Sequence, residues 1–120
     1  MPELGGSEQA KKTGAKLVTI YWRDIPAQVN AQIGRNRSQV VLHQRFQVAI
    51  DRAAMIAGKA DADDYLAEWR REARPCGDDL DAEAAAAAAK LEADYPHLLV
   101  ARIADNGGID LDKAYAPKAD

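Results

Sequence analysis

The sequence predicts an α+β fold: a small, mostly antiparallel sheet of three strands packed on three helices, in the order ββαααβ. Three observations lead to this prediction. The first third of the chain contains a β-branched and aromatic run and then a period-two alternation, both typical of strands. The middle carries apolar residues at helical spacing. A short apolar run after the last helical pattern predicts a closing strand, and we expect the helices on one face of the sheet.

The length of 120 residues suits a single domain. A domain of this size buries about two-thirds of its unfolded surface, so it holds a core without disulfides or metal. Apolar residues make up 48% of the chain and charged residues 29%, as in an ordinary folded protein. Residues 1–15 lack an apolar period and predict a flexible tail. The predicted domain covers residues 16–104, and residues 105–120 are predicted to form a flexible acidic tail.

Two strands and a turn are predicted between residues 16 and 34. The run KLVTIYW, residues 16–22, carries apolar groups on both faces, which predicts a central strand. Pro26 fixes its own φ and lacks an N–H, so the RDIP stretch forms a turn. The run AQVNAQIG, residues 27–34, alternates apolar and polar residues and predicts a half-buried strand. Its wet polar face consists of Gln28, Asn30 and Gln32.

A long first helix is predicted from about Asn36, with Asn36 or Ser38 as its cap and Gly58 at its end. Its inner face has residues at i, i+4, i+7, i+11 and i+14: Leu42, Phe46, Ala49, Ala53 and Ile56. Three more apolar residues, spaced by seven, widen this stripe: Val41, Val48 and Met55.

The second helix is predicted to begin at Asp61 or Asp63. Its inward residues are Leu66, Trp69 and Ala73. The third helix runs from about Asp79 to Asp94, and its acidic first turn suits the helix dipole. Residues 98–103, opened by Pro96, predict the third strand.

Charge is distributed unevenly along the chain. Residues 16–74 contain ten Lys and Arg against seven Asp and Glu, whereas residues 75–120 contain four against ten. A nucleic-acid-binding domain needs a concentrated basic face, and this small basic excess is interleaved with acids, which argues against nucleic acid. We expect the two parts to face each other, or the acidic part to be a solvated surface.

The single cysteine, Cys76, cannot form an internal disulfide, which fits a reducing compartment. No apolar run approaches the roughly 20 residues of a membrane span, and the first residues lack the apolar core of a secretory signal. We therefore expect a cytoplasmic protein without a membrane contact.

The most unusual stretch surrounds the predicted turn, where Trp22, Arg23 and Asp24 stand together. Trp and Arg are frequent anchors of recognition sites, and a loop on a rigid hairpin is a common place for function. The alternative is that Trp22 packs in the core while Arg23 and Asp24 decorate the turn.

Arginines form the second candidate group. Arg35 and Arg37 precede the first predicted helix and lie near its positive end, which is an anion site in principle. Arg45 and Arg52 are seven residues apart and share a face of that helix. The alternative is a set of solvated charges with helical partners. The candidate binding residues are therefore Trp22, Arg23, Asp24, Arg35, Arg37 and Arg45.

No pattern in the chain predicts a reaction. Cys76 is distant in sequence from His43 and His97, and Asp78 and Asp79 would raise its pKa, so it does not resemble an activated thiol. Two histidines and one cysteine so far apart do not predict a metal site. The DNGG stretch fits an Asn-Gly turn better than a calcium loop. We expect no catalytic residues, no metal site and no cofactor.

The segments YWRDIPAQV, RFQVAIDRAAM and YLAEWRRE, with the basic segment between the first two, resemble a bacterial virulence-factor domain family. The resemblance covers roughly Leu17 to Arg74, with a weaker similarity at LEADYPHLL. It implies no chemistry and no catalytic residues. Related stretches occur in larger chains beside helical repeats, and such genes neighbour folate- and corrinoid-dependent one-carbon enzymes. The resemblance thus implies an accessory or subunit role there.

We expect a non-catalytic accessory or protein-interaction module whose partner is another protein or a second copy of the chain. A sheet of three strands would leave its polar face or an edge poorly covered, and such edges invite pairing. The alternative is a small enzyme or ligand-binding protein that holds an anionic substrate in a pocket lined by Arg35, Arg45 and Asp24.

Overall fold

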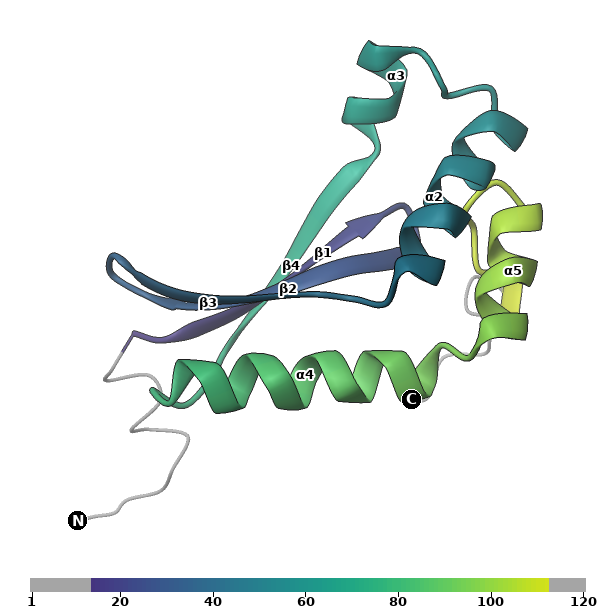
Figure 1. The fold of residues 1–120 in the computed structure, drawn as a ribbon. Helices are drawn as coiled ribbons and strands as arrows, with labels where there is room; N and C mark the ends of the chain where they lie inside the picture. The colour runs from purple at the N-terminus through teal and green to yellow at the C-terminus, as the bar shows by residue number, and fades with distance from the viewer. Residues whose placement is uncertain (1–13, 113–120) are drawn as a thin grey trace, which may run out of the picture.

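The computed structural model describes residues 14–112 and shows an antiparallel sheet of four strands with four helices in that range (Figure 1). The strands are β1 (Lys16–Trp22), β2 (Ile25–Ile33), β3 (Asn36–Val41) and β4 (Trp69–Pro75). The helices are α2 (Gln44–Ile56), α3 (Ala62–Ala67), α4 (Leu80–Asp94) and α5 (His97–Asp105). The α+β class and the antiparallel sheet are confirmed, but the predicted order ββαααβ is wrong, because the described order is βββααβαα.

The sheet order is β3-β2-β1-β4, so β1 is central, as its two apolar faces predict. In the β1–β2 ladder Leu17 lies opposite Ala31 and Thr19 opposite Val29, and a bulge shifts the register between Ile20 and Tyr21. Val29 and Ala31 are fully buried, which agrees with the predicted alternation of β2.

Residues 36–41 form strand β3 and not the start of a long helix. Pairing with β2 satisfies the backbone groups of alternate residues, and the N–H of Leu42 continues the ladder by donating to the Ala27 carbonyl at 3.0 Å. Helix α2 starts only at Gln44, where the His43 side chain accepts the Arg45 N–H at 3.0 Å. The predicted caps Asn36 and Ser38 are therefore wrong.

The second helix is much shorter than predicted, because α3 ends at Ala67 and residues 69–75 form the fourth strand. This strand pairs with β1 along its whole length, which gives β1 its second neighbour. Leu66, expected to face inward, is 64% exposed. The third predicted helix is confirmed as α4, and the Asp79 side chain caps it through the Ala82 N–H at 3.2 Å.

The predicted closing strand at 98–103 is wrong, since these residues lie within helix α5. Pro96 occupies the N-cap position, where a missing N–H costs nothing. Val100, Ile103 and Ala104 are buried against α2 at helical spacing. A short apolar run is ambiguous between strand and helix, and here packing against α2 selects the helix.

The elements form two groups around the sheet (Figure 1). Helix α4 runs along one face beneath β2 and β3, while α2, α3 and α5 gather at the end where β1 turns into β2. On α2, Phe46, Ala49 and Ala53 are buried as predicted. Val48 and Met55, expected to widen the apolar stripe, are exposed at 64% and 72%. No helix in residues 14–112 has the length and apolarity to cross a bilayer.

The predicted tails lie largely outside the described residues, which begin at Gly14 and end at Asp112. Between Asp105 and Asp112, however, Gly107 and Gly108 are buried. This part of the chain packs against the β1–β2 turn.

Candidate functional site

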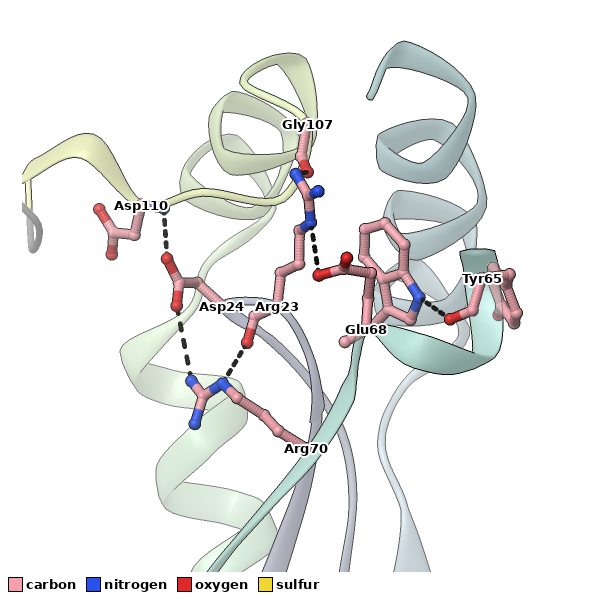
Figure 2. A network of polar contacts seen from close by, with 8 residues as sticks. Arg23, Asp24, Tyr65, Glu68, Arg70, Gly107 and Asp110 are labelled. Carbon is pink, nitrogen blue, oxygen red and sulfur yellow. Dashed lines mark hydrogen bonds and ion pairs between the residues drawn. The ribbon is translucent and has the colours of Figure 1, made fainter. Parts of the chain in front are cut away.

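The β1–β2 turn lies within a network of polar contacts that joins three parts of the chain (Figure 2). Arg23 has a φ of +55°, which is uncommon for a residue with a side chain. Its N–H donates to the Glu68 carbonyl at 3.1 Å and its Nε to the Glu68 carboxylate at 3.0 Å. Its Nη1 donates to the Gly107 carbonyl at 3.1 Å. Arg23 thus joins the turn to the α3–β4 junction and to the segment after α5.

Asp24 makes a second set of bonds from the same turn. Its N–H donates to the Gly108 carbonyl at 2.9 Å, and its Oδ2 accepts the Asp110 N–H at 2.8 Å. Arg70 closes the network, because its Nη2 lies 3.5 Å from Asp24 Oδ1 and its Nε donates to the Arg23 carbonyl at 2.7 Å (Figure 2). These bonds occupy both carboxylate oxygens of Asp24.

Trp22 is fully buried. Its Nε1 donates to the Tyr65 carbonyl at 2.9 Å, and its ring stacks on that of Tyr65 at 5.8 Å. Gly108 lies against the indole, and a Cβ there would stand 3.0 Å from Trp22 Cζ3 and 3.3 Å from Arg23 Cβ. A partner that leaves this fold intact therefore cannot touch Trp22. The YWRD and DNGG stretches form one structural corner.

The structure does not bring the candidate arginines together. Arg35 lies in the exposed β2–β3 turn and Asp24 in the β1–β2 turn, at opposite ends of β2. The nine residues of this strand span about 30 Å. Arg45 lies in the first turn of α2. The predicted pocket lined by Arg35, Arg45 and Asp24 is therefore not formed.

Arg45 instead connects α2 to the end of α4. Its Nη2 donates to the carbonyls of Glu92 at 2.9 Å and Tyr95 at 3.1 Å, and its guanidinium lies 4.6 Å from the Phe46 ring centroid. The carbonyls at a helix C-terminus carry partial negative charge, so the cation is well placed there. This role was not predicted, because the sequence does not show which helix end lies beside Arg45.

Grooves are present at two places in the described part of the chain that bear on the candidate residues. One, of about 720 Å³, separates α2 from α5 and is lined by Arg45, Arg52, Val48, His43, His97 and Val100. Arg45 and Arg52 share this groove, but Arg52 is paired with Asp105, whose Oδ1 accepts from Arg52 Nε at 2.9 Å. The second, of about 260 Å³, lies between β4 and α4.

Titratable groups outside these grooves do not form a reactive cluster. Burial, with the Glu83 carboxylate nearby, raises the pKa of the Cys76 thiol, so the thiolate is disfavoured. Burial also raises the pKa of Tyr95 to about 12, and Tyr21, Asp110 and Asp24 add to this effect. In residues 14–112 no three His, Cys, Asp or Glu side chains gather as a metal ion requires.

The face of the sheet opposite α4 is a further candidate site, separate from the β1–β2 turn and from the two grooves. Leu17, Thr19 and Tyr21 line the groove against α4, so alternate residues of β1 point to the other side. No described helix lies over the middle of that side (Figure 1). Strand pairing places the following side chains there, and we call them the uncovered face: Val18, Ile20, Gln28, Asn30, Gln32, Arg37, Gln39, Arg71 and Ala73.

Asn30 lies at the centre of the uncovered face between Val18 and Gln39. It was predicted to be wet but is only 3% exposed. Its Oδ1 is closed to solvent and accepts no hydrogen bond from any described residue. A buried polar atom without a partner is costly, so such atoms call for an explanation. Arg37 is the one candidate binding residue that belongs to this face.

A family model described as Virulence factor matches residues 20–103. The matched range begins in β1 and ends in α5, so it contains the β1–β2 turn, most of the uncovered face and both helices of the larger groove. No curated protein and no solved structure gives a significant match to the chain.

Proposed function

Since the chain belongs to the virulence factor family, whose name specifies no reaction, we propose that this domain is a non-catalytic protein-interaction module that binds a partner through its uncovered face. The observation that carries the proposal is the uncovered face itself, over whose middle no described helix lies and on which Arg37, Gln39 and Arg71 are exposed.

The chemistry of the uncovered face indicates the kind of partner. Gln28, Gln32 and Gln39 offer both donors and acceptors, and Arg37 and Arg71 add positive charge near two edges of the face. A partner surface rich in amides and carboxylates complements such a face. The family resemblance makes a folate- or corrinoid-dependent one-carbon enzyme the candidate partner. The proposal includes a cytoplasmic location, which the single cysteine supports.

The test uses the tagged chain as bait in an extract of its host, followed by identification of the captured protein and measurement of its Kd with purified components. Arg37→Glu and Gln39→Ala change exposed positions of the uncovered face. Arg102→Glu, on α5, makes the same charge change away from that face and serves as the matched control.

We expect the wild type and the Arg102→Glu control to bind the captured protein equally, and Arg37→Glu to weaken binding by about tenfold or more. Capture of a one-carbon enzyme would support the named partner. Equal binding by all three variants would show that the uncovered face is not the interface.

The second candidate function is binding of a small anion in the groove between α2 and α5. Arg45 and Arg52 both line it, as their seven-residue spacing predicted. Titration with inorganic phosphate, followed by NMR, tests it. Shifts confined to α2 and α5 and lost in Arg52→Ala would favour this function over protein binding.

A further inference from the structure

Strand β4 is one edge of the sheet, and its residues from Arg71 to Pro75 are exposed. Two hydrogen bonds show how its backbone is oriented. Arg23 N–H donates to the Glu68 carbonyl and Cys76 N–H to the Ala15 carbonyl, each at 3.1 Å. Alternate residues of an antiparallel ladder turn their backbone groups to opposite sides. Arg71 and Ala73 therefore present their N–H and C=O groups at the outer edge, where no other strand of residues 14–112 pairs and another strand can add. We call this outer edge the free edge.

The two edges of the sheet differ in charge. In β3 the single charged residue is Arg37, so two copies of β3 would bring together only like charges. Strand β4 carries charges of both signs, with Glu72 between Arg70, Arg71 and Arg74. It can therefore be complementary to a second copy of itself.

Charge selects one register for such a pair. Side chains directly opposite in an antiparallel pair lie on the same face and interact strongly. With Glu72 opposite Glu72, like charges meet. With Arg71 opposite Arg71, two arginines meet at the centre of the pair, although Glu72 of each copy then lies opposite Arg70 of the other. With Ala73 opposite Ala73, Glu72 of each copy lies opposite Arg74 of the other. Pro75 then lies opposite Arg71, and its carbonyl can accept the Arg71 N–H.

We propose that the free edge of β4 is a self-association surface, at which a second copy of the chain adds its own β4 antiparallel with Ala73 opposite Ala73. The two sheets become one continuous sheet. This surface is the edge of the sheet, whereas the proposed partner interface is its uncovered face, so either can fail without the other.

The pairing also completes a groove. Helix α4 makes its main contacts with β2 and β3, so β4 lies beside the helix on that face. The hollow of about 260 Å³ found there is lined by Leu17, Tyr21, Glu72, Arg74, Lys90 and Leu91. In the pair, the hollows of the two copies meet across the two β4 strands, with an α4 helix on each side. Arg74 of the second copy lies on this face opposite Glu72, so the second copy contributes a residue to the groove.

Single cysteine variants test the register. Ala73→Cys places two thiols opposite each other, about 5.5 Å apart between Cα atoms, which a disulfide can span. Arg71→Cys is the matched control, because in this register its two copies are offset by four residues, about 14 Å. Cys76 is present in both variants and is buried.

On mild oxidation we expect Ala73→Cys to form a covalent dimer and Arg71→Cys to stay monomeric on a non-reducing gel. A dimer of Arg71→Cys alone would overturn the register. Absence of covalent dimer from both would overturn edge pairing.

Charge reversal tests the pairing without any crosslink. Glu72→Arg and Arg74→Glu each place like charges opposite one another twice in the pair, so each should raise the dimer Kd by about tenfold in analytical ultracentrifugation. The double variant restores both opposite-charge pairs and should recover the wild-type Kd. A double variant as weak as the singles, or a wild type that stays monomeric, would overturn the proposal. Arg37→Glu, which weakens partner binding, should leave the dimer intact.

Discussion

The two turns at the ends of β2 each contain a residue with the same positive φ but differ in what surrounds that residue. The closed turn, Arg23–Asp24, has Arg23 at φ +55°, and the open turn, Gly34–Arg35, has Gly34 at the same φ of +55°. The closed turn is bonded to segments on both sides, whereas a Cβ added at Gly34 would meet nothing within 4 Å. The same φ is thus stabilised by tertiary hydrogen bonds at Arg23 and is accessible at Gly34 because glycine has no Cβ.

This difference shows when the conformational preference of a residue decides which residue type occupies a turn. A left-handed conformation costs a residue with a Cβ about 1–2 kcal/mol, so glycine is the expected occupant wherever nothing else holds the turn. At the closed turn the Arg23 side chain bonds Glu68 and Gly107, and hydrogen bonds to charged groups contribute about 1.5–3 kcal/mol each. The contacts outweigh the strain, so an arginine occupies a position where glycine would be expected.

The largest effect on stability is expected when the Trp22 indole beneath the closed turn is removed. Trp22→Ala should lower the free energy of unfolding by about 3–5 kcal/mol, because it empties a fully buried site. Arg35→Ala, in the open turn, should change it by less than about 0.5 kcal/mol. Urea unfolding followed by circular dichroism measures both. A Trp22→Ala variant as stable as Arg35→Ala would contradict the conclusion that Trp22 stabilises the fold by packing beneath the closed turn.

Glycine substitutions separate strain from packing. Gly34→Ala should cost about 1 kcal/mol, from the positive φ alone. Gly108→Ala, at φ +92°, adds a Cβ 3.0 Å from Trp22 and should cost about 3 kcal/mol, because overpacking adds to the strain. The midpoints of urea unfolding give the difference. Equal losses would mean that Gly108 is not tightly packed against the indole.

The carboxylate of the closed turn should matter less than its packing. Asp24→Ala should cost about 2 kcal/mol, because the Asp110 N–H and Arg70 both lose an acceptor. Asp24→Asn keeps an acceptor oxygen and should lose less. Thermal unfolding of both variants measures this, and equal losses in Asp24→Asn and Asp24→Ala would show that the charge of Asp24, and not its acceptor oxygen, stabilises the turn.

The smallest effect is a dependence on alkaline pH. An unfolded tyrosine loses its proton near pH 10, whereas Tyr95 in the folded state keeps it to about pH 12. Between these values the unfolded state binds fewer protons, so the free energy of unfolding falls as pH rises. The contribution is complete below pH 10. Urea unfolding at pH 9 and pH 11 should show a larger fall for the wild type than for Tyr95→Phe, and equal slopes would contradict the raised pKa.

The sequence predicted the strands and helices whose signals are local. The alternation in β2 predicted the burial of Val29 and Ala31, although Asn30 on the predicted wet face is buried as well. The Asp79 cap and the alanine run predicted α4 almost to the residue. The error at β3 has a physical cause. The helical spacing from Phe46 to Ala53 is real, but it was extended back over residues 36–41, which pair with β2.

Strand β4 was missed because its character comes from a distant partner. Its seven residues include three arginines and a glutamate, so no apolar alternation marks it, and β1, about fifty residues earlier, supplies its ladder. The surroundings of the candidate site could not be predicted for the same reason. Trp22, Arg23 and Asp24 were noticed because they are unusual together, but only the fold shows that Tyr65, Glu68 and Gly108 occupy their bonding groups.

The closed turn has a consequence for synthesis of the chain. The Arg23 guanidinium bonds a carbonyl 84 residues later, and the Asp24 carboxylate bonds an N–H 86 residues later. At roughly 5–20 residues per second, a ribosome needs about 4 to 17 seconds to make that stretch. During this time the first hairpin has left-handed strain at Arg23 without the bonds that offset it. The hairpin can therefore reach its final stability only when residues 107–110 emerge, and a nascent chain stalled before them should hold its first turn loosely.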